Sequence, residues 1–253
     1  MSGFVKVLAI RFAAIRMTKP DAIILAGGLG TRLQGTLPHL PKVLAPINGT
    51  PFLDILMKSL DNSHLVSRLI IAVGYMAGHI IKRYRNTKQY GFKIAFSEER
   101  ELLGTGGAVK KALEYSDSAN VLCFNGDSYV EVDLKELIGF HEKKGGAMTI
   151  VVKRVDNVDR YGSVRCDDKE RIISFEEKEP SKDGGFVNAG LYVFRRELFD
   201  GVESNRAISF EKELLPGFVN KGIFAYVSRG RFIDIGTAES YKEADHFFTG
   251  SVL

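Results

Sequence analysis

The chain has 253 residues, of which 45% are hydrophobic and 26% charged, so it is long enough for one large α/β domain with a sizeable core or for two small domains. No apolar run approaches the ~20 residues that a membrane-spanning helix needs, and two cysteines cannot form a disulfide framework, which favours a reducing, cytoplasmic compartment. Four of the basic residues (Lys6, Arg11, Arg16, Lys19) lie in the first twenty positions. The remaining 31 basic residues balance the 31 acidic residues. The charge pattern therefore does not indicate a nucleic-acid partner.

The segment 1–19 is set apart from the fold. It is basic and apolar, but Arg11 interrupts it and no small-residue cleavage site follows, so it is a weak secretory signal. It fits either an amphipathic helix or an extension upstream of a true start at Met17, and we favour the extension. Residues 20–253 are expected to form a single domain.

From residue 20 to about 155, apolar runs typical of buried strands alternate with amphipathic, helix-like segments. The run 22–27 predicts a strand that ends in glycine, and 51–62 predicts a helix behind a proline start. Further strands are expected at 68–74, 92–99, 120–127 and 147–155, with helices at 79–86, 107–116 and 133–144 between them. This order predicts a doubly wound α/β sheet whose strands are mostly parallel.

After residue 156 the pattern changes to strand-like pieces separated by turn residues. Strands are expected at 163–167, 171–178, 186–194, 223–228 and 232–236. A helix is expected at 209–219, with Ser209 as its N-cap, and another at 237–248. This half (156–253) is expected to be a lobe added to the first half (20–155), not an independent domain.

The stretch AIILAGGLGTRLQG (22–35) is the first candidate site. Its glycines do not complete G-x-G-x-x-G, because Leu33 stands where the third glycine would be; the loop starting at Gly104 fails likewise, and no G-x-x-x-x-G-K-[ST] motif is present. A glycine-rich turn after a parallel strand still exposes backbone N–H groups that can bind an anion, and Arg32 adds a planar fork of donors that suits phosphate. The alternative on these residues alone is a tight turn with a surface arginine.

Six further motifs, in order after the first, give the site a family context. GGLGTRL is followed by LPKVLAPINGTPFL (40–53), ELLGTGGAVKKAL (101–113), FNGD (124–127), FEEK (175–178), VNAGLY (187–192) and FIDIGTAESY (232–241). Over roughly 21–245 the chain resembles the sugar-1-phosphate nucleotidyltransferases. The resemblance implies a Rossmann-like, doubly wound mixed sheet with a sugar-binding lobe in the second half, the nucleotide-diphospho-sugar transferase fold. It also implies that an oxygen of a sugar 1-phosphate attacks the α-phosphorus of a nucleoside triphosphate and that pyrophosphate leaves.

The resemblance assigns a role to each matching position. Arg32 and Lys42 would neutralise the triphosphate, Lys178 would bind the sugar phosphate, and Asp127 and Asp234 would hold Mg²⁺, a hard ion that needs only one or two carboxylates besides substrate phosphates. The nucleotide would be bound by Leu25, Gly27, Gly28, Gly30, Thr31, Leu103, Gly104, Gly106 and Gly107. The sugar would be bound by Asn125, Gly126, Tyr161, Gly162, Glu177, Asn188 and Gly190.

The residues themselves allow plainer interpretations. Asn125 and Gly126 form a strong turn signal, so Asp127 could simply follow a turn, although the buried strand before it favours a site at its carboxyl end. Lys178 stands in a charged run that would ordinarily be solvated. Asp234 alternates with apolar residues and needs a partner, which a metal would supply. Val43 replaces a proline that many relatives carry after the Pro-Lys pair, which we expect to matter little.

Within the family, LGTGGA, DRYGSV (159–164), ISFEEK (173–178) and FIDIGT look most like the D-glycero-α-D-manno-heptose 1-phosphate guanylyltransferases. Mannose-1-phosphate guanylyltransferases and enzymes that use UTP, dTTP or CTP remain alternatives, as does a catalytically silent regulatory or nucleotide-sugar-binding subunit. The presence of Arg32, Lys42, Asp127, Lys178 and Asp234 together favours an active enzyme. A homo-oligomer is compatible with the sequence, and no membrane or nucleic-acid partner is expected.

Overall fold

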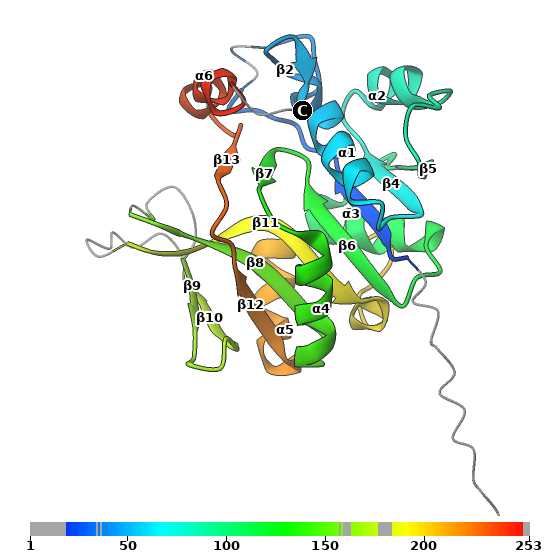
Figure 1. The fold of residues 1–253 in the computed structure, drawn as a ribbon. Coiled ribbons are helices and arrows are strands. Elements are labelled where there is room, and N and C mark those ends of the chain that lie inside the picture. Colours follow the sequence, from blue (N-terminus) through cyan, green and yellow to red (C-terminus); the bar gives the residue numbers. More distant parts are fainter. Residues whose placement is uncertain are drawn as a thin grey trace, which may run out of the picture.

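The computed structural model describes residues 19–33, 35, 37–156, 158, 163–176 and 184–249. Their main feature is a nine-stranded mixed sheet. Four parallel strands of the first half lie in the order β6-β1-β4-β5 (Figure 1). They are β1 (Asp21–Leu25), β4 (Arg68–Val73), β5 (Lys93–Glu98) and β6 (Asn120–Asn125). The expected parallel, doubly wound half is thereby confirmed.

The second half continues the same sheet. The long strand β11 (Gly185–Arg195) pairs antiparallel with β6 on one side and with β8 (Met148–Val155) on the other. The strand β12 (Ile223–Val227) then pairs parallel with β8. A hairpin of β9 (Ser163–Cys166) and β10 (Ile172–Glu176) extends from β11. The sheet is therefore mixed, as expected, and β11 joins its two halves.

Helices cover both faces of the sheet, and the core is split accordingly. Neighbouring residues on β1 point to opposite faces: Ile24 packs in the core under one set of helices and Ile23 in the core under the other. One face carries α1 (Phe52–Ser63), α2 (Ala77–Tyr84), α4 (Leu134–Lys144) and α6 (Ala238–Phe247). The other carries α3 (Gly104–Ala112), α5 (Leu215–Phe218) and the 3₁₀ turn η3 (Arg196–Phe199). Among the described residues, no helix has the length and apolar character to cross a membrane.

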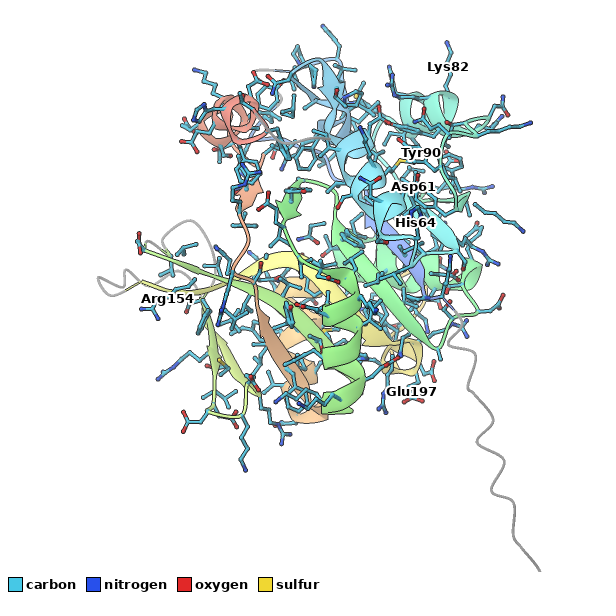
Figure 2. All side chains as sticks on the ribbon, in the orientation of Figure 1. Asp61, His64, Lys82, Tyr90, Arg154 and Glu197 are labelled. Carbon is cyan, nitrogen blue, oxygen red and sulfur yellow. The ribbon has the colours of Figure 1, made fainter. Side chains whose placement is uncertain are left out.

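Side-chain caps fix several helix boundaries. Asp133 accepts hydrogen bonds from the backbone N–H groups of Lys135 and Glu136, which starts α4 where the sequence predicts it. The helix α1 ends at His64, whose φ of 54° is left-handed. Near this end Asp61 accepts a hydrogen bond of 2.6 Å from the N–H of Gly91, which ties α1 to the loop before β5 (Figure 2).

The segment 209–219 differs from the single helix that its periodicity predicts. Ser209 is the expected N-cap, and its Oγ accepts from the N–H of Lys212 at 3.1 Å. A π-helical turn, η4 (Phe210–Leu214), follows, and α5 and the 3₁₀ turn η5 (Val219–Lys221) complete the segment. Pro216 lacks an N–H and sits in the first turn of α5, where none is needed, so the regular helix begins only there.

Short elements that the sequence analysis did not predict complete the structure. They are η1 (Lys42–Leu44), β2 (Pro46–Ile47), β3 (Thr50–Pro51) and β7 (Ser128–Val130), whereas the 3₁₀ turn η2 (Leu113–Tyr115) is the end of the helix predicted at 107–116. The strand β7 pairs antiparallel with β13 (Phe232–Asp234) beside the carboxyl end of β6. This small pairing brings a late segment of the chain to the edge where the first-half strands end.

Candidate functional site

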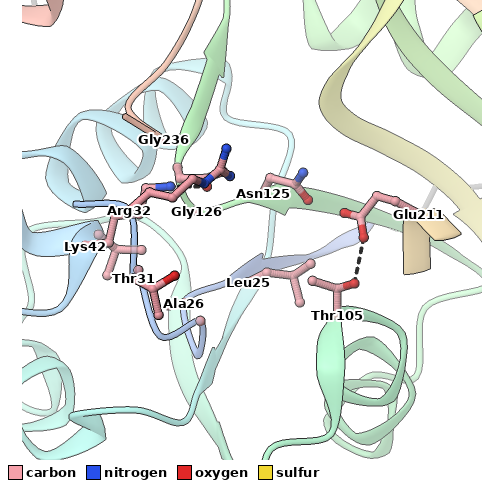
Figure 3. A pocket seen from close by; sticks show the side chains of 14 residues that line it. Leu25, Ala26, Thr31, Arg32, Lys42, Thr105, Asn125, Gly126, Glu211 and Gly236 are labelled. Carbon is pink, nitrogen blue, oxygen red and sulfur yellow. Dashed lines mark hydrogen bonds and ion pairs between the residues drawn. The ribbon is translucent and has the colours of Figure 1, made fainter. Parts of the chain in front are cut away.

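A pocket of about 260 Å³ opens at the carboxyl ends of β1 and β6 (Figure 3). Ligands of doubly wound sheets gather at this edge, because the loops there leave a crevice. Several sequence-predicted residues line the pocket together: Leu25, Gly28, Gly30, Thr31, Arg32, Lys42, Asn125, Gly126 and Asp127. Its lining also includes Ala26, Val43, Thr105, Glu211 and Gly236. Residues far apart in the sequence thus converge on one cavity.

The glycine-rich loop after β1 forms one wall. Gly30 has a φ of 61°, which an L side chain rarely adopts, and a Cβ there would lie 3.2 Å from Cβ of Lys42. Gly27 lies outside the pocket lining, and a Cβ on it would lie 3.1 Å from the backbone nitrogen of Gly74. Gly30 therefore admits Lys42 to the pocket, whereas Gly27 lets the loops after β1 and β4 pack together.

Positive and negative groups meet at one end of the pocket. The Nζ atom of Lys42 lies 2.5 Å from Oδ2 of Asp127, and only 12% of the lysine side chain is exposed. Arg32 lines the same end from the glycine-rich loop (Figure 3). Two cations beside a carboxylate form a site that suits phosphate oxygens and the metal ion that accompanies them.

The two predicted metal carboxylates come from neighbouring segments: Asp234 is the last residue of β13, and Asp127 lies in the turn directly before β7. Asp234 on β13 pairs in register with Ser128 on β7, directly after Asp127. The N–H of Ile235 donates to the backbone oxygen of Asp127 at 2.8 Å, which locks the two segments together. Oδ1 of Asp234 accepts from the N–H of Gly236 at 2.8 Å.

This donor set fits Mg²⁺ and not a metal that requires a complete protein cage. No group of three or more His, Cys, Asp or Glu side chains with metal-binding geometry occurs in the described part of the chain. Two hard carboxylates plus substrate phosphates are the usual ligands of Mg²⁺. The pair Asp127 and Asp234 is therefore the place where such an ion would be held.

The segment 103–107, named here the loop 103–107, runs into the first turn of α3 and has a packing role; the predicted nucleotide-binding role of its glycines stays a prediction. Gly104, Gly106 and Gly107 lie outside the pocket lining. A Cβ on Gly104 would lie 2.6 Å from the backbone oxygen of Ile208, and one on Gly107 would lie 2.5 Å from that of Arg206. The N–H of Gly106 donates to the same oxygen of Ile208 at 2.9 Å. These glycines allow a segment of the second half to dock closely on the loop.

The described residues predicted to bind sugar form a group on β6 and β11. Nδ2 of Asn188 donates to the hydroxyl oxygen of Tyr192 at 2.7 Å, and Oδ1 of Asn188 accepts from the N–H of Gly190. Gly190 has a φ of 75°, and a Cβ there would lie 3.0 Å from Cβ of Asn125. Tyr161, Gly162, Glu177 and Lys178 lie outside the described residues, so their predicted roles stay predictions.

Two side chains of the site were missed by sequence reasoning. Thr105 lies within the quoted loop LGTGGA but carries no signal of its own. Glu211 lies in SFEKEL, where three consecutive charged residues are typical of a solvated stretch of helix. In the structure the hydroxyl of Thr105 donates to Oε2 of Glu211 at 2.7 Å, inside the pocket (Figure 3). Only the docking of segment 206–211 on the loop reveals this pair.

A further carboxylate lies between the glycine-rich loop and the loop 103–107. Oε2 of Glu99 accepts from the N–H of Leu103 at 2.9 Å. Its Oε1 would lie 3.0 Å from a Cβ on Gly27. Burial raises the pKa of Glu99 above its usual value, and the Leu103 hydrogen bond and the charge of Lys111 oppose that rise.

Comparison with known proteins accounts for this arrangement. The model of the nucleotidyl transferase family matches residues 21–251. A D-glycero-alpha-D-manno-heptose 1-phosphate guanylyltransferase of Campylobacter jejuni is 38% identical over 87% of this chain and 96% of its own length. The enzyme of the same name from Aneurinibacillus thermoaerophilus is 36% identical over 88% of this chain and 96% of its own length.

A solved structure agrees with the sequence relatives. The crystal structure of HddC from Yersinia pseudotuberculosis complexed with GMP-PN has a TM-score of 0.81 and 36% identity to this chain, and the match covers 90% of this chain and 99% of that one. The match with the family model and the two relatives covers both halves of the sheet. On this evidence the chain belongs to the nucleotidyl transferase family.

Proposed function

We propose that the protein transfers a guanylyl group from GTP to D-glycero-α-D-manno-heptose 1-phosphate, forming the GDP-heptose and releasing pyrophosphate. The observation that carries the proposal is the pocket in which Arg32, Lys42 and Asp127 meet at the end of two parallel strands. The relatives whose names specify this reaction are 36% and 38% identical to the chain over nearly their full lengths. Mannose 1-phosphate and other nucleoside triphosphates remain the alternative substrates.

In the proposed reaction the chain contributes position and charge. Arg32 and Lys42 neutralise the triphosphate and the departing pyrophosphate, and the backbone of the glycine-rich loop holds the phosphates. Lys178 is proposed to bind the sugar phosphate. No side chain needs to form a covalent intermediate, because the attacking oxygen belongs to the sugar 1-phosphate.

The proposal includes Mg²⁺, held by Asp127 and Asp234. When bound, the ion would neutralise charge on the phosphate oxygens during the displacement. Asp127 would then exchange its contact with Lys42 for the ion, and Lys42 would turn its charge to the phosphates. The pairing of β7 with β13 supports this assignment because it places Asp234 opposite Ser128, the residue that follows Asp127.

The choice of guanine is supported by Glu99. Guanine presents two adjacent N–H donors, at N1 and N2, on one edge, and a carboxylate can accept both. Uracil, thymine and cytosine lack this pair of donors. Glu99 lies between the glycine-rich loop and the loop 103–107, which both carry predicted nucleotide-binding residues, and its Oε2 accepts from the N–H of Leu103. The relative HddC, crystallised with GMP-PN, supports a guanine nucleotide as well.

We further propose that the protein works in the cytoplasm. Its substrates would be the nucleoside triphosphate and the sugar 1-phosphate. Both cysteines, Cys123 and Cys166, are unpaired, which fits a reducing compartment. A homo-oligomer remains compatible with the chain.

The test is pyrophosphate release by the purified protein with Mg²⁺. GTP, UTP, CTP, dTTP and ATP are each combined with the 1-phosphates of the heptose, mannose, glucose and N-acetylglucosamine. Release with GTP and the heptose phosphate supports the proposal, and the same reaction in excess EDTA is the control for metal dependence. Release with another pair would correct the substrates, and silence with every pair would favour a catalytically silent regulatory subunit.

A further inference from the structure

Glu211 reaches the pocket from a segment to which the family motifs assign no role. It lines the cavity together with Thr105 and Asn125. Figure 3 shows it on the side of the pocket away from Arg32 and Lys42. A carboxylate is an anion and repels phosphate, so Glu211 is suited to contact another part of the substrates.

The position of Glu211 is fixed by its surroundings. The Thr105 hydroxyl donates to its Oε2 at 2.7 Å, and the same hydroxyl oxygen accepts from the N–H of Phe210 at 2.8 Å. The π-helical turn itself is closed by the N–H groups of Glu213 and Leu214, which both donate to the backbone oxygen of Ser209 at 3.2 Å. Such turns inside helices are frequent at functional sites, because they redirect one side chain without ending the helix.

Two residues that line the pocket carry acceptor oxygens that lack donors among the described residues. Within the part of the chain that the structure describes, Oε1 of Glu211 has no hydrogen-bond partner. Oδ1 of Asn125 is buried and also has none. A buried acceptor without a donor is costly, so a bound ligand that supplies donors would be favoured there. Phosphate oxygens cannot donate, whereas sugar hydroxyls can.

The neighbours of Glu211 belong to the predicted sugar site. Its negative charge, together with burial, raises the pKa of the Tyr192 hydroxyl on β11. That hydroxyl accepts from Nδ2 of Asn188 at 2.7 Å. The proposed function, by contrast, assigns the guanine edge to Glu99, whose Oε2 accepts from the N–H of Leu103. The carboxylate of Glu211 is thus available for the sugar.

We infer that Glu211 is a further sugar-binding residue of the transferase. Its Oε1 accepts a hydrogen bond from a hydroxyl of the sugar 1-phosphate, next to Oδ1 of Asn125, and so helps to select the configuration of the sugar ring. This inference rests on the proposed function, because it requires that a sugar 1-phosphate occupies the pocket beside the nucleotide.

The test is the variant Glu211→Gln. Glutamine keeps the length of the side chain and an oxygen that accepts from Thr105, but it replaces the second acceptor with a donor. We expect the KM for the sugar 1-phosphate to rise about tenfold or more, because the substrate loses one hydrogen bond to a charged group. The KM for the nucleoside triphosphate should stay within about twofold. Glu213→Gln, which makes the same charge change in the same turn outside the pocket lining, is the matched control.

Three outcomes would overturn the inference. The first is an unchanged KM for the sugar 1-phosphate. The second is a raised KM for the nucleoside triphosphate alone, which would mean that Glu211 reads the nucleotide. The third is an equal rise for both substrates with a lower unfolding temperature, which would mean that Glu211 only holds the segment in place.

Failure of the proposed function would be visible separately, in the wild-type protein. If wild type turns over a different pair, the variants are measured with that pair. If it turns over none, calorimetric binding of GDP and of the GDP-heptose to wild type and variant replaces the kinetics. Weaker binding of the GDP-heptose alone to Glu211→Gln supports the inference, and equal binding of the two ligands to wild type overturns it.

Discussion

Asp127 is the residue at which the charges of the site meet. It contacts Lys42 at 2.5 Å and follows the strand β6 that forms the pocket floor. We expect Asp127→Asn to lower kcat by at least about 100-fold, since even residues that only orient a metal ligand cost 10–100-fold when they are changed. The measurement is pyrophosphate release with the substrate pair that wild type uses. Asp117→Asn, which removes the same charge from a side chain that is 97% exposed, should leave kcat unchanged.

The same substitution should leave the fold intact. Asparagine keeps a side-chain oxygen that can accept from Nζ of Lys42, so the nearly buried lysine is not left without a partner. Asparagine also has nearly the same volume as aspartate. The unfolding temperature should therefore change little, and a variant that keeps near wild-type kcat would contradict the metal role of Asp127.

His141 gives the protein a predictable response to acid. It is 2% exposed, and its Nδ1 lies 3.0 Å from the hydroxyl of Thr149. Burial, with a smaller effect from the charge of Arg195, lowers its pKa from 6.5 to about 4. The unfolded chain therefore binds a proton at a pH where the folded chain does not, so stability is complete above pH 6.5 and declines as the pH falls toward 4.

The variant His141→Gln tests this response. Glutamine can still bond to Thr149 but does not titrate, so the unfolding temperature of the variant should be lower than that of wild type at pH 8 and should fall less between pH 6.5 and 4. The exposed His79, changed to Gln, is the control and should follow wild type. Parallel curves for wild type and His141→Gln would show that His141 does not carry the acid response.

At the scale of an element, two helical glycines allow the effect of packing on stability to be measured apart from the effect of helix propensity. Gly139 in α4 has open space where a Cβ would stand, whereas a Cβ on Gly107 in α3 would lie 2.5 Å from the backbone oxygen of Arg206. Gly139→Ala should stabilise the protein by about 0.5–1 kcal/mol. Gly107→Ala gains the same propensity but must displace backbone, so we expect a net loss of roughly 1–3 kcal/mol. Denaturant unfolding measures both, and stabilisation by both substitutions would contradict the docking of segment 206–211 on the loop.

The elements also show which parts of the fold can be predicted from the sequence and which cannot. Strands such as β1 and β6 were predictable because short apolar runs that end in glycine or a turn leave few alternatives, and α4 was predictable because its apolar residues stand three and four positions apart. The π-helical turn at 210–214 was not, since its periodicity is that of an ordinary helix and its shape depends on contact with a loop a hundred residues earlier. The order of the motifs was enough to predict that Arg32, Lys42 and Asp127 lie in one site. Glu211 could not be predicted, because its place in the pocket depends on the same contact with the distant loop.

At the scale of the whole molecule, the position of β11 in the sheet determines whether the two halves can fold independently. It lies between β6 of the first half and β8, and its residues Tyr192, Val193 and Phe194 are completely buried. Each such side chain contributes about 1.5–3 kcal/mol by burial. A fragment that ends at residue 155 would expose this surface and leave the edge of β6 unpaired. The halves should therefore unfold together.

We accordingly expect a single cooperative transition for the full chain and no stable fold for a fragment of residues 20–155. The chain has no tryptophan, so circular dichroism and calorimetry are the suitable probes. Coincident curves, with equal calorimetric and van't Hoff enthalpies, are the expected result. Saturating GTP with Mg²⁺ should move the whole transition upward, because a ligand held in the first half stabilises every element that unfolds with it. Two resolved transitions, only one of which GTP shifts, would instead mean that β11 can leave the sheet and that the sugar-binding half folds on its own.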